Sequence, residues 1–349
     1  MPFSLGHVSA PVVYESSAHM PVAMQIAQSK SVDQSELIKI LPPARAKSGL
    51  LGFVDPRPGE TPQAWGIRIA EKYLLSQASA SKDILHLEFP LSDGAYYAEL
   101  QNEIAKRFPK EAERPTIMLS LRNSTLPPER VIGLVGGLGP LADASLVCQV
   151  EMELNSNRPP EHSVELRLNS DPHPPRTVSW CWSYMMDIWN FMHERDVDEF
   201  VLGSNTAHIY MSLFNWLSND RMFDGVNYVA QDLKNKTPVP TRILVLGTSS
   251  AYEHELYPKV LRELGLEVAS PSKEEQKRVQ RAIDLIKSGQ IEQGRQILSV
   301  LMSELAKPPV SHVLLACTEL PLAIDREYEC EVVDTSAIFA KHIAERLRI

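Results

Sequence analysis

Short apolar runs alternate with longer amphipathic stretches along most of the chain after residue 130. The apolar runs predict strands at residues 131–135, 164–168, 200–202, 242–246, 267–269 and 312–316. The amphipathic stretches predict helices at residues 141–154, 178–194, 207–216, 251–264, 273–287 and 291–306. Strands that alternate with helices in this way predict parallel sheets covered by helices on both faces.

The first third of the chain has a weaker pattern of the same kind. It predicts strands at residues 49–54, 84–89 and 116–121 and helices at residues 63–77 and 96–108, which together form a small α/β unit. Pro127 and Pro128 mark the end of this unit. Residues 1–35 hold seven serines, few charges and no sustained period. We expect them to form a mobile leader or, alternatively, an export signal that is not cleaved.

Two stretches after residue 129 have corresponding spacings. Gly136 stands 68 residues before Ser204, and Gly247 stands 70 residues before Cys317. Ser204 and Cys317 each follow a predicted strand and begin a short polar loop. Because ligands of parallel α/β sheets bind at the carboxyl ends of strands, we expect Ser204 and Cys317 to line one cleft between two pseudo-symmetric, Rossmann-like halves.

The expected fold class is therefore α/β, in four parts. These are a leader at residues 1–35, an α/β extension of unknown role at 36–128, a first half at 129–240 in which a C-terminal helix could cross over, and a second half at 241–349. A length of 349 residues fits two domains. Contents of 44% hydrophobic and 23% charged residues are typical of soluble globular proteins.

Charge and cysteine content exclude several functions. With 35 Lys plus Arg against 44 Asp plus Glu, the net charge of -9 indicates no partner among nucleic acids or anionic membranes. Apolar runs fall well short of the roughly 18 residues that cross a bilayer. Four cysteines without a Cys-x-x-Cys pair fit a reducing cytoplasm and predict no zinc site. No metal is expected, because four histidines considered as ligands do not have metal-binding spacing with carboxylates. These are His162, His173, His193 and His208.

Three features after residue 130 are candidates for chemistry. Cys317 stands where a strand meets a predicted helix N-terminus, whose N–H groups would lower the thiol pKa and make it a base or nucleophile. A buried structural cysteine is the alternative. The loop at residues 136–140 offers backbone N–H groups to an anion, or is a tight turn without a ligand. Arg176, after a proline-rich loop, could hold a carboxylate in a forked geometry or cap a surface turn.

Five motifs occur together in one order. They are Gly-Gly-Leu-Gly-Pro at 136–140, residues 171–177, Ser-Asn-Thr-Ala-His at 204–208, residues 271–276 leading into 286–289, and Cys-Thr-Glu-Leu-Pro at 317–321. In this combination, over about residues 130–349, the chain resembles the aspartate/glutamate racemase family, which needs no pyridoxal phosphate. In that family two cysteines flank the Cα of an amino acid, and one removes the proton that the other replaces on the opposite face. Cys317 corresponds to the second cysteine, but Ser204 stands in place of the first, and a serine hydroxyl is a far weaker acid.

The resemblance implies roles for further residues. The substrate-binding positions would be Gly137, Gly139, Arg176, Asn205, Thr206, Thr248, Lys287 and Thr318. Lys287 would lie near the distal acidic group of the substrate, although a lysine at a helix end also has a structural explanation. Glu319 and His208 are auxiliary candidates. His208 could activate Ser204, or it could be a buried helix residue.

Three functions remain open at this point. The first is a cofactor-independent racemase or epimerase of aspartate or glutamate, asymmetric or slow because of Ser204. The second is a decarboxylase or isomerase of a related dicarboxylate that uses the single thiol of Cys317. The third is an inactive protein that binds an amino acid or a protein partner. The resemblance also implies a homodimer, and the aromatic residues at 180–184 could lie in an interface or in the core.

Overall fold

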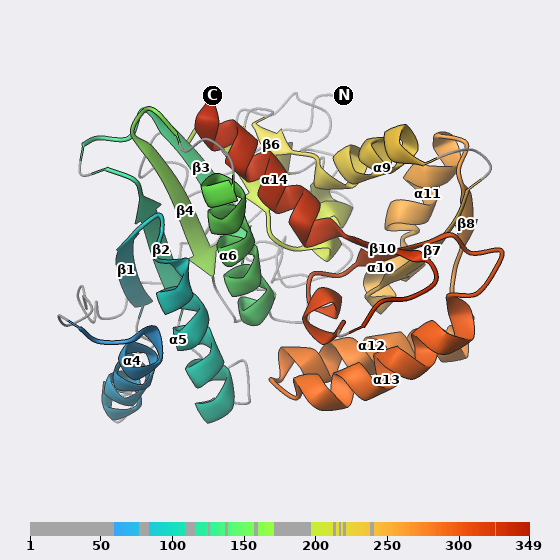
Figure 1. Cartoon of the computed structure of the whole chain (residues 1–349), viewed down its shortest axis with the longest axis horizontal. Coiled ribbons are helices and arrows are strands. Elements are labelled where there is room, and N and C mark those ends of the chain that lie inside the picture. Colours follow the sequence, from blue (N-terminus) through green and yellow to red (C-terminus); the bar gives the residue numbers. More distant parts are fainter. Residues whose placement is uncertain are drawn as a thin grey trace, which may run out of the picture.

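The computed structural model contains two sheets flanked by helices (Figure 1). It describes residues 59–76, 84–108, 116–124, 126–136, 139–156, 160–170, 197–211, 214–215, 218, 221–237, 241–324 and 326–349. The expected leader, the strand at 49–54, the helix at 178–194 and the aromatic residues at 180–184 lie outside the described residues. The expected α/β class with largely parallel sheets is confirmed.

The first sheet has six strands in the order β1-β2-β4-β3-β5-β6. The strands are β1 (Ile84–Pro90), β2 (Thr116–Arg122), β3 (Arg130–Gly136), β4 (Val164–Ser170), β5 (Glu199–Leu202) and β6 (Met222–Phe223). Neighbouring strands are parallel except for β2 and β4, which are antiparallel. Because β1 and β2 come from the expected extension, the extension continues the sheet of the first half.

The second sheet has four parallel strands in the order β10-β9-β7-β8. The strands are β7 (Arg242–Gly247), β8 (Glu267–Ala269), β9 (His312–Ala316) and β10 (Glu331–Asp334). Every residue of β9 is buried, because alternate side chains point to opposite faces and both faces are covered. Leu314 joins a core that continues into the first half, whereas Val313 and Leu315 pack beneath α12 (Lys273–Lys287) and α13 (Ile291–Leu305).

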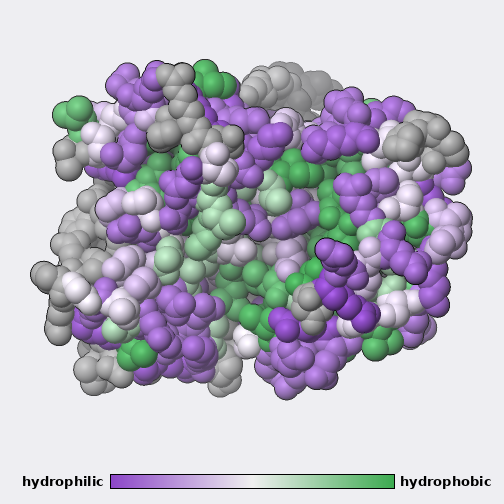
Figure 2. All heavy atoms as spheres, viewed as in Figure 1, coloured by the Kyte–Doolittle hydropathy of each residue, from purple (hydrophilic) through white to green (hydrophobic). Residues whose placement is uncertain are grey.

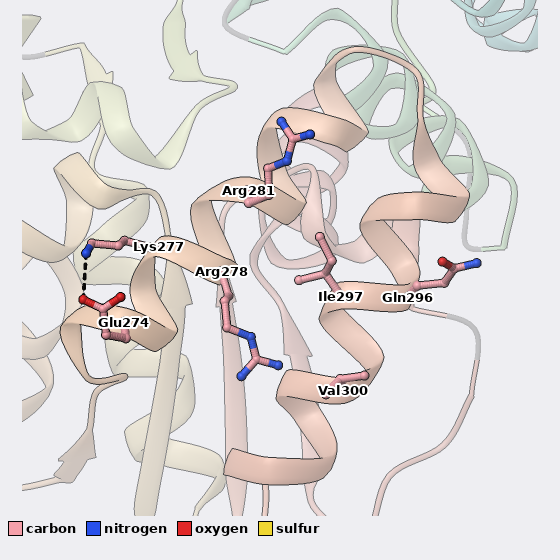
Figure 3. A pocket seen from close by; sticks show the side chains of 7 residues that line it. All are labelled: Glu274, Lys277, Arg278, Arg281, Gln296, Ile297 and Val300. Carbon is pink, nitrogen blue, oxygen red and sulfur yellow. Dashed lines mark hydrogen bonds and ion pairs between the residues drawn. The ribbon is translucent and has the colours of Figure 1, made fainter.

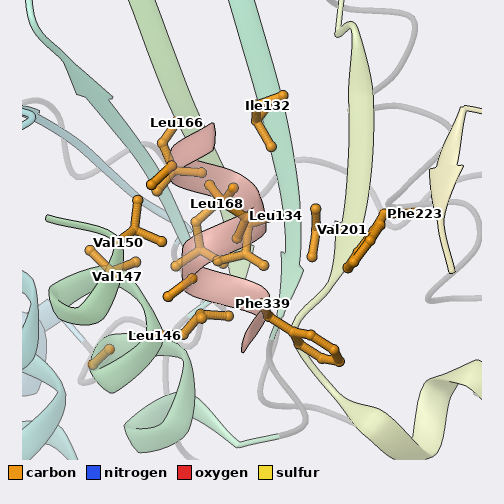
Figure 4. Packing of buried hydrophobic residues seen from close by; sticks show 14 of the residues in the cluster. Ile132, Leu134, Leu146, Val147, Val150, Leu166, Leu168, Val201, Phe223 and Phe339 are labelled. Atoms are coloured by element: carbon orange, nitrogen blue, oxygen red, sulfur yellow. The ribbon is translucent and has the colours of Figure 1, made fainter. Parts of the chain in front are cut away.

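Four helices pack side by side along the first sheet (Figure 1). They are α4 (Pro62–Ser76), α5 (Gly94–Arg107), α6 (Pro140–Ser156) and α14 (Thr335–Arg348). The C-terminal helix α14 leaves the second sheet and packs on α6, β3 and β4. Figure 4 shows the core at this place, where side chains of three strands meet those of α6 and α14: Leu134, Leu168, Val201, Val147, Val150 and Phe339.

Two helices differ from the expected pattern. The helix expected at 251–264 is two helices, α10 (Ser249–Glu253) and α11 (Leu256–Glu263). Glu255 between them has a left-handed backbone, with φ of 49°. Pro258 lacks an N–H and its ring would clash with the carbonyl four residues earlier, so it is accommodated in the first turn of a new helix. The helix expected at 207–216 begins as the 3-10 helix η5 (Asn205–Tyr210).

A buried ion cluster joins β2 to β4. The Glu165 side chain, 0% exposed, accepts hydrogen bonds from the Ser120 hydroxyl (2.8 Å) and from Arg167 Nε (2.9 Å). Arg122 Nη2 lies 3.2 Å from the other carboxylate oxygen. Burial alone would raise the pKa of Glu165, but the hydrogen bond and charge of Arg167 lower it overall. The contacts of Ser120 and Arg122 with Glu165 cross from β2 to β4, so they support the register in which the extension joins the first half.

The extension also reaches the second half. Gly289, in the turn between α12 and α13, has a positive φ of 81° and lies against α5, where an added Cβ would be 3.7 Å from Ala105 Cβ. On the face shown in Figure 2, apolar surface gathers in the middle, between the helices of the two halves, and polar side chains cover the outer helices. No helix in the described part of the chain is both long enough and apolar enough to cross a membrane.

Candidate functional site

The apolar strand β9 delivers Cys317 to the carboxyl edge of the second sheet. Its side chain is buried, with 3% of the residue exposed. The thiol Sγ donates a hydrogen bond to Glu319 Oε2 at 2.9 Å. The chain then turns into the 3-10 helix η6 (Leu320–Ala323). A thiol and a carboxylate therefore face each other two residues apart at the end of a central strand.

The expectation of a lowered thiol pKa is wrong for this structure. Burial raises the pKa of the Cys317 thiol well above its usual range, and the negative charge of Glu319 raises it further, while Lys287 opposes this effect. The helix that follows is a single 3-10 turn that starts only at Leu320. The backbone N–H of Glu319 does hydrogen-bond the sulfur and lowers the thiol pKa, but burial and the negative charge of the Glu319 carboxylate outweigh this effect. The resting thiol is protonated.

Glu319 connects three parts of the site. Its Oε2 accepts from Cys317 and from the Thr318 hydroxyl at 3.4 Å. Its Oε1 lies 3.5 Å from Lys287 Nζ, at the end of α12. Gly139, in the loop after β3, lies so close that an added Cβ would be 1.8 Å from Oε1. The side chain of Glu319 is only 4% exposed, so its charge is balanced chiefly by Lys287.

The first half contributes Ser204, which follows β5. The chain is held there because Gly203 N donates to the Val135 carbonyl at 2.8 Å. Ser204 precedes η5, has an extended backbone and makes no capping hydrogen bond with its side chain. Its hydroxyl is half-buried and is not tied to the helix that follows.

His208 contacts the backbone of Ser204 and not its hydroxyl. The imidazole Nδ1 lies 3.0 Å from the Ser204 carbonyl oxygen, and because that oxygen only accepts, Nδ1 carries the proton. Nε2 is buried and has no hydrogen-bond partner in the described part of the chain. Burial lowers the pKa of His208, so the ring is neutral. This geometry favours the reading of His208 as a buried helix residue.

Asn205 and Thr206 join the two halves. Asn205 is 1% exposed; its Nδ2 donates to Thr335 Oγ1 at 2.9 Å and its Oδ1 accepts from the Tyr257 hydroxyl. The hydroxyls of Thr206 and Thr248 are 2.8 Å apart. Thr248 also caps α10, since its oxygen accepts from Ala251 N at 3.2 Å. The loop after Ser204 is thereby fastened to the second half.

The residues expected from the sequence thus form two groups, and two are not described. The structure brings together Cys317, Thr318, Glu319, Lys287 and Gly139, and separately Ser204, Asn205, Thr206, Thr248 and His208. Gly137 and Arg176 lie outside the described residues. Sequence reasoning missed Tyr257 and Thr335, because a buried hydroxyl in a helix carries no signal of a partner 52 or 130 residues away.

A surface groove lies away from these residues. It has a volume of about 520 Å³ and runs along α12 and α13 (Figure 3). Its lining residues are Glu274, Lys277, Arg278, Arg281, Gln296, Ile297 and Val300. Two of its cations are neutralised, since Lys277 pairs with Glu274 and Arg278 with Glu304, so the groove has little net charge to offer a ligand.

Within the described ranges of the chain, no cluster of His, Cys, Asp and Glu could hold a metal ion.

Solved structures with a similar fold are aspartate racemases and their homologues. The aspartate racemase of Picrophilus torridus has a TM-score of 0.52 at 23% identity, covering 62% of this chain and 94% of that one. An aspartate racemase homologue from Pyrococcus horikoshii has a TM-score of 0.51 at 22% identity, with 62% and 99% covered. At these identities the likeness concerns the fold alone.

The family is established by the sequence itself. The family model for Asp/Glu/hydantoin racemases matches residues 135–343, more than half of the chain, and the chain belongs to this family. The broad specificity amino-acid racemase RacX of Bacillus subtilis is 28% identical over 152 residues, which are 43% of this chain and 65% of that protein. The chain therefore spans slightly less than two thirds of this relative. The family resemblance carried by the five motifs is confirmed.

Proposed function

We propose that the protein is a cofactor-independent isomerase that moves a proton at the Cα of an acidic amino acid, aspartate or glutamate. Cys317 works on one face of Cα and Ser204 on the other, each at the end of a strand in its own half. Membership of the racemase family supports the reaction class. The observation that carries the proposal is the hydrogen bond of 2.9 Å between Cys317 Sγ and Glu319 Oε2.

This pair gives the thiol a path for its proton. As a base, Cys317 must first be a thiolate, and Glu319 is the acceptor for the thiol proton. The thiolate then takes the Cα proton, and the electron pair left on Cα delocalises into the substrate carboxylate. In the reverse direction, the protonated thiol is already poised to return a proton to that carbanion. Burial and the Glu319 charge, which raise the pKa of Cys317, make the second role the easier one.

Lys287 supports an acidic substrate. Its ammonium group already binds a carboxylate, that of Glu319, at 3.5 Å. A substrate carboxylate that takes over part of this contact releases Glu319 to accept the thiol proton. Arg176 provides the second cation of the proposed clamp, with Gly137, Gly139, Thr206, Thr248 and Thr318 as polar contacts around the substrate.

Ser204 makes the proposed reaction asymmetric. A hydroxyl is a poor base at neutral pH, and His208, which contacts only the Ser204 carbonyl, does not activate it. Proton return from the Ser204 side therefore proceeds by way of the hydroxyl and a water molecule held beside it. We expect kcat to differ between the two enantiomers at saturating substrate, whereas kcat/KM is the same in both directions because the enantiomers are equally stable.

The experiment is deuterium incorporation at Cα from D₂O, followed by NMR for both enantiomers of aspartate and glutamate. The wild type exchanges the Cα proton, and Cys317→Ser lowers the rate by at least about 100-fold, the lower end of what a positioned acid or base contributes. Ser204→Cys raises the rate of racemisation, because it restores a second thiol. A folded wild type that exchanges none of the four substrates contradicts the proposal.

Ser204 also favours a second candidate. An enzyme with one thiol can protonate the planar enolate left after loss of carbon dioxide from a dicarboxylate, which needs an acid on one face only. Release of carbon dioxide from a disubstituted malonate by the wild type, with no exchange of aspartate or glutamate, supports this alternative. If neither reaction occurs, the remaining interpretation is an inactive protein that binds an amino acid or a protein partner.

The proposal extends to assembly and location. The working site lies between a first half at residues 129–240 and a second half at 241–349, and residues 36–128 are an extension of the first half. By resemblance to the family, the protein is a homodimer, needs neither pyridoxal phosphate nor metal, and acts in the cytoplasm. Secretion of the intact chain, directed by residues 1–35, is the alternative location.

A further inference from the structure

A chain of buried hydrogen bonds crosses from one half to the other. The Tyr257 hydroxyl donates to Asn205 Oδ1, Asn205 Nδ2 donates to Thr335 Oγ1 at 2.9 Å, and the Thr335 hydroxyl donates to the Leu315 carbonyl at 2.9 Å. The three side chains are at most 1% exposed. The Leu315 carbonyl can only accept, so Thr335 donates to it and accepts from Asn205 Nδ2, and the direction of the whole chain is fixed.

The middle of this chain, at Asn205, and one of its ends, at Leu315, lie close in sequence to the two reacting positions. Asn205 directly follows Ser204, and Leu315 lies in β9 two residues before Cys317. Tyr257 comes from α11 in the second half, and Thr335 is the first residue of α14, which returns to the first half. Both partners of the Asn205 amide thus come from the second half, and they fasten the loop after Ser204 to it.

The amide of Asn205 bonds to protein partners at both of its polar atoms. Its oxygen and its nitrogen are both engaged by buried protein hydroxyls, so freeing either one would leave a buried polar group unpaired. An apolar contact at this place would hold the halves together without a defined direction. A directional polar chain instead sets one distance and one orientation.

We propose that Tyr257 and Thr335 are positioning residues, which act through Asn205 to hold the backbone of Ser204 at a fixed distance from the strand that carries Cys317. This inference rests on the proposed function and deepens it, because proton transfer on two faces requires both groups in place at once. Asn205 then serves as a link between the halves in place of the substrate contact that the family resemblance implies.

The variants Tyr257→Phe and Thr335→Val each remove one link. We expect kcat for racemisation to fall by roughly 10-fold to 100-fold, as a displacement of about 1 Å at a reacting group does, while KM changes little. One of the two enantiomers presents its Cα proton to Cys317. On this enantiomer, exchange of the proton for deuterium without inversion persists, because the contacts of Cys317 with Glu319 are untouched. The ratio of inversion to exchange therefore falls. An equal loss of both would indicate general damage and overturn the proposal.

Two matched variants separate positioning from stability. Thr335→Ser keeps the hydroxyl and is expected to retain most of the activity that Thr335→Val loses. Tyr228→Phe removes a tyrosine hydroxyl from α9 (Gly225–Lys236), away from the chain of hydrogen bonds, and is expected to leave kcat unchanged.

The double variant tests whether the two links act together. Because both links act through Asn205, Tyr257→Phe and Thr335→Val together lower kcat by less than the product of their separate effects. Independent effects would contradict a shared role.

A measurement without substrate keeps this inference separate from the proposed function. Amide hydrogen exchange at residues 203–211 is expected to become roughly 10-fold faster in Tyr257→Phe, as loss of one buried hydrogen bond predicts, and to be unchanged in Tyr228→Phe. If the wild type is inactive but this change occurs, the proposed reaction fails and the link stands. If the wild type is active and the exchange is unchanged, the link fails alone.

Discussion

At the scale of single residues, the chemistry of a side chain is set by what lies within a few ångströms of it. The sequence places Cys317 at the end of a strand, and this is correct. It does not reveal that the neighbouring charge is Glu319, because the direction of a side chain two residues on depends on a 3-10 turn and not on a helix. The thiol pKa is therefore raised where the sequence suggested a lowered one.

His208 gives a residue-scale prediction for pH. Burial lowers its pKa in the folded state, so the unfolded chain binds this proton first and folding stability falls as pH drops below about 6.5, the ordinary value for histidine. In His208→Asn the amide can still donate to the Ser204 carbonyl but does not titrate. We expect the free energy of unfolding in urea to fall less steeply between pH 7 and pH 5 in this variant.

The comparison of slopes removes other contributions. Asn is smaller than His, so the variant is less stable at pH 7, but this difference does not depend on pH. Carboxyls with lowered pKa, such as Glu165 and Glu199, lose stability toward lower pH in both proteins alike. Parallel slopes for the two proteins would show that the pKa of His208 is the same in the folded and unfolded states, which contradicts this prediction.

At the scale of elements, the strands that the sequence predicts best are those with continuous apolar runs. β3, β7 and β9 lie where expected, because both faces of each strand are buried. The short strands β6 and β10 were not expected, because each has only two apolar residues in a row, and in β10 these stand between Glu331 and Asp334. Helix α9 was also missed. No bounds were predicted for α14, but the expectation that a C-terminal helix could cross to the first half agrees with its packing on α6. The antiparallel pairing of β2 with β4 includes the contacts of Ser120 and Arg122 with Glu165, which is more than 40 residues away in sequence.

The loop after β3 gives an element-scale prediction. A Cβ at residue 139 would lie 1.8 Å from Glu319 Oε1, so Gly139→Ala pushes this carboxylate away from Cys317 and Lys287. We expect kcat for Cα proton exchange to fall by roughly 10-fold or more, with a smaller change in stability. Steady-state kinetics and urea unfolding measure the two effects.

Gly265→Ala is the control for this prediction. Gly265 ends α11 with a φ of 77°, and no atom lies within 4 Å of an added Cβ. Its substitution strains the backbone by about 1 kcal/mol without touching Glu319. The two variants should therefore differ in what they lose: Gly139→Ala lowers kcat, and Gly265→Ala lowers the free energy of unfolding. Unchanged kcat in Gly139→Ala would mean that Glu319 has no part in catalysis.

At the scale of the whole molecule, the sequence predicts two halves, and the structure adds what ties them together. The repeat in spacing identifies Ser204 and Cys317 as corresponding strand ends. The return of α14 to the first sheet and the continuous core with Ile132, Leu314 and Tyr257 are contacts between distant parts of the chain. Periodicity reports which residues are buried, but not which half buries them. The halves should accordingly unfold as one unit.

Tryptophan fluorescence can test whether the two halves unfold together, because all five tryptophans precede residue 217 and none lies in the second half. Tryptophan fluorescence therefore reports on the first part of the chain, whereas far-ultraviolet circular dichroism reports on all helices. We expect the two urea transitions of the wild type to coincide. Phe339→Ala, which empties a fully buried position on α14 beside Phe223 and His208, lowers the free energy of unfolding by about 3–5 kcal/mol and shifts both transitions together. A circular dichroism transition that remains after the fluorescence change is complete would show that the second half folds independently.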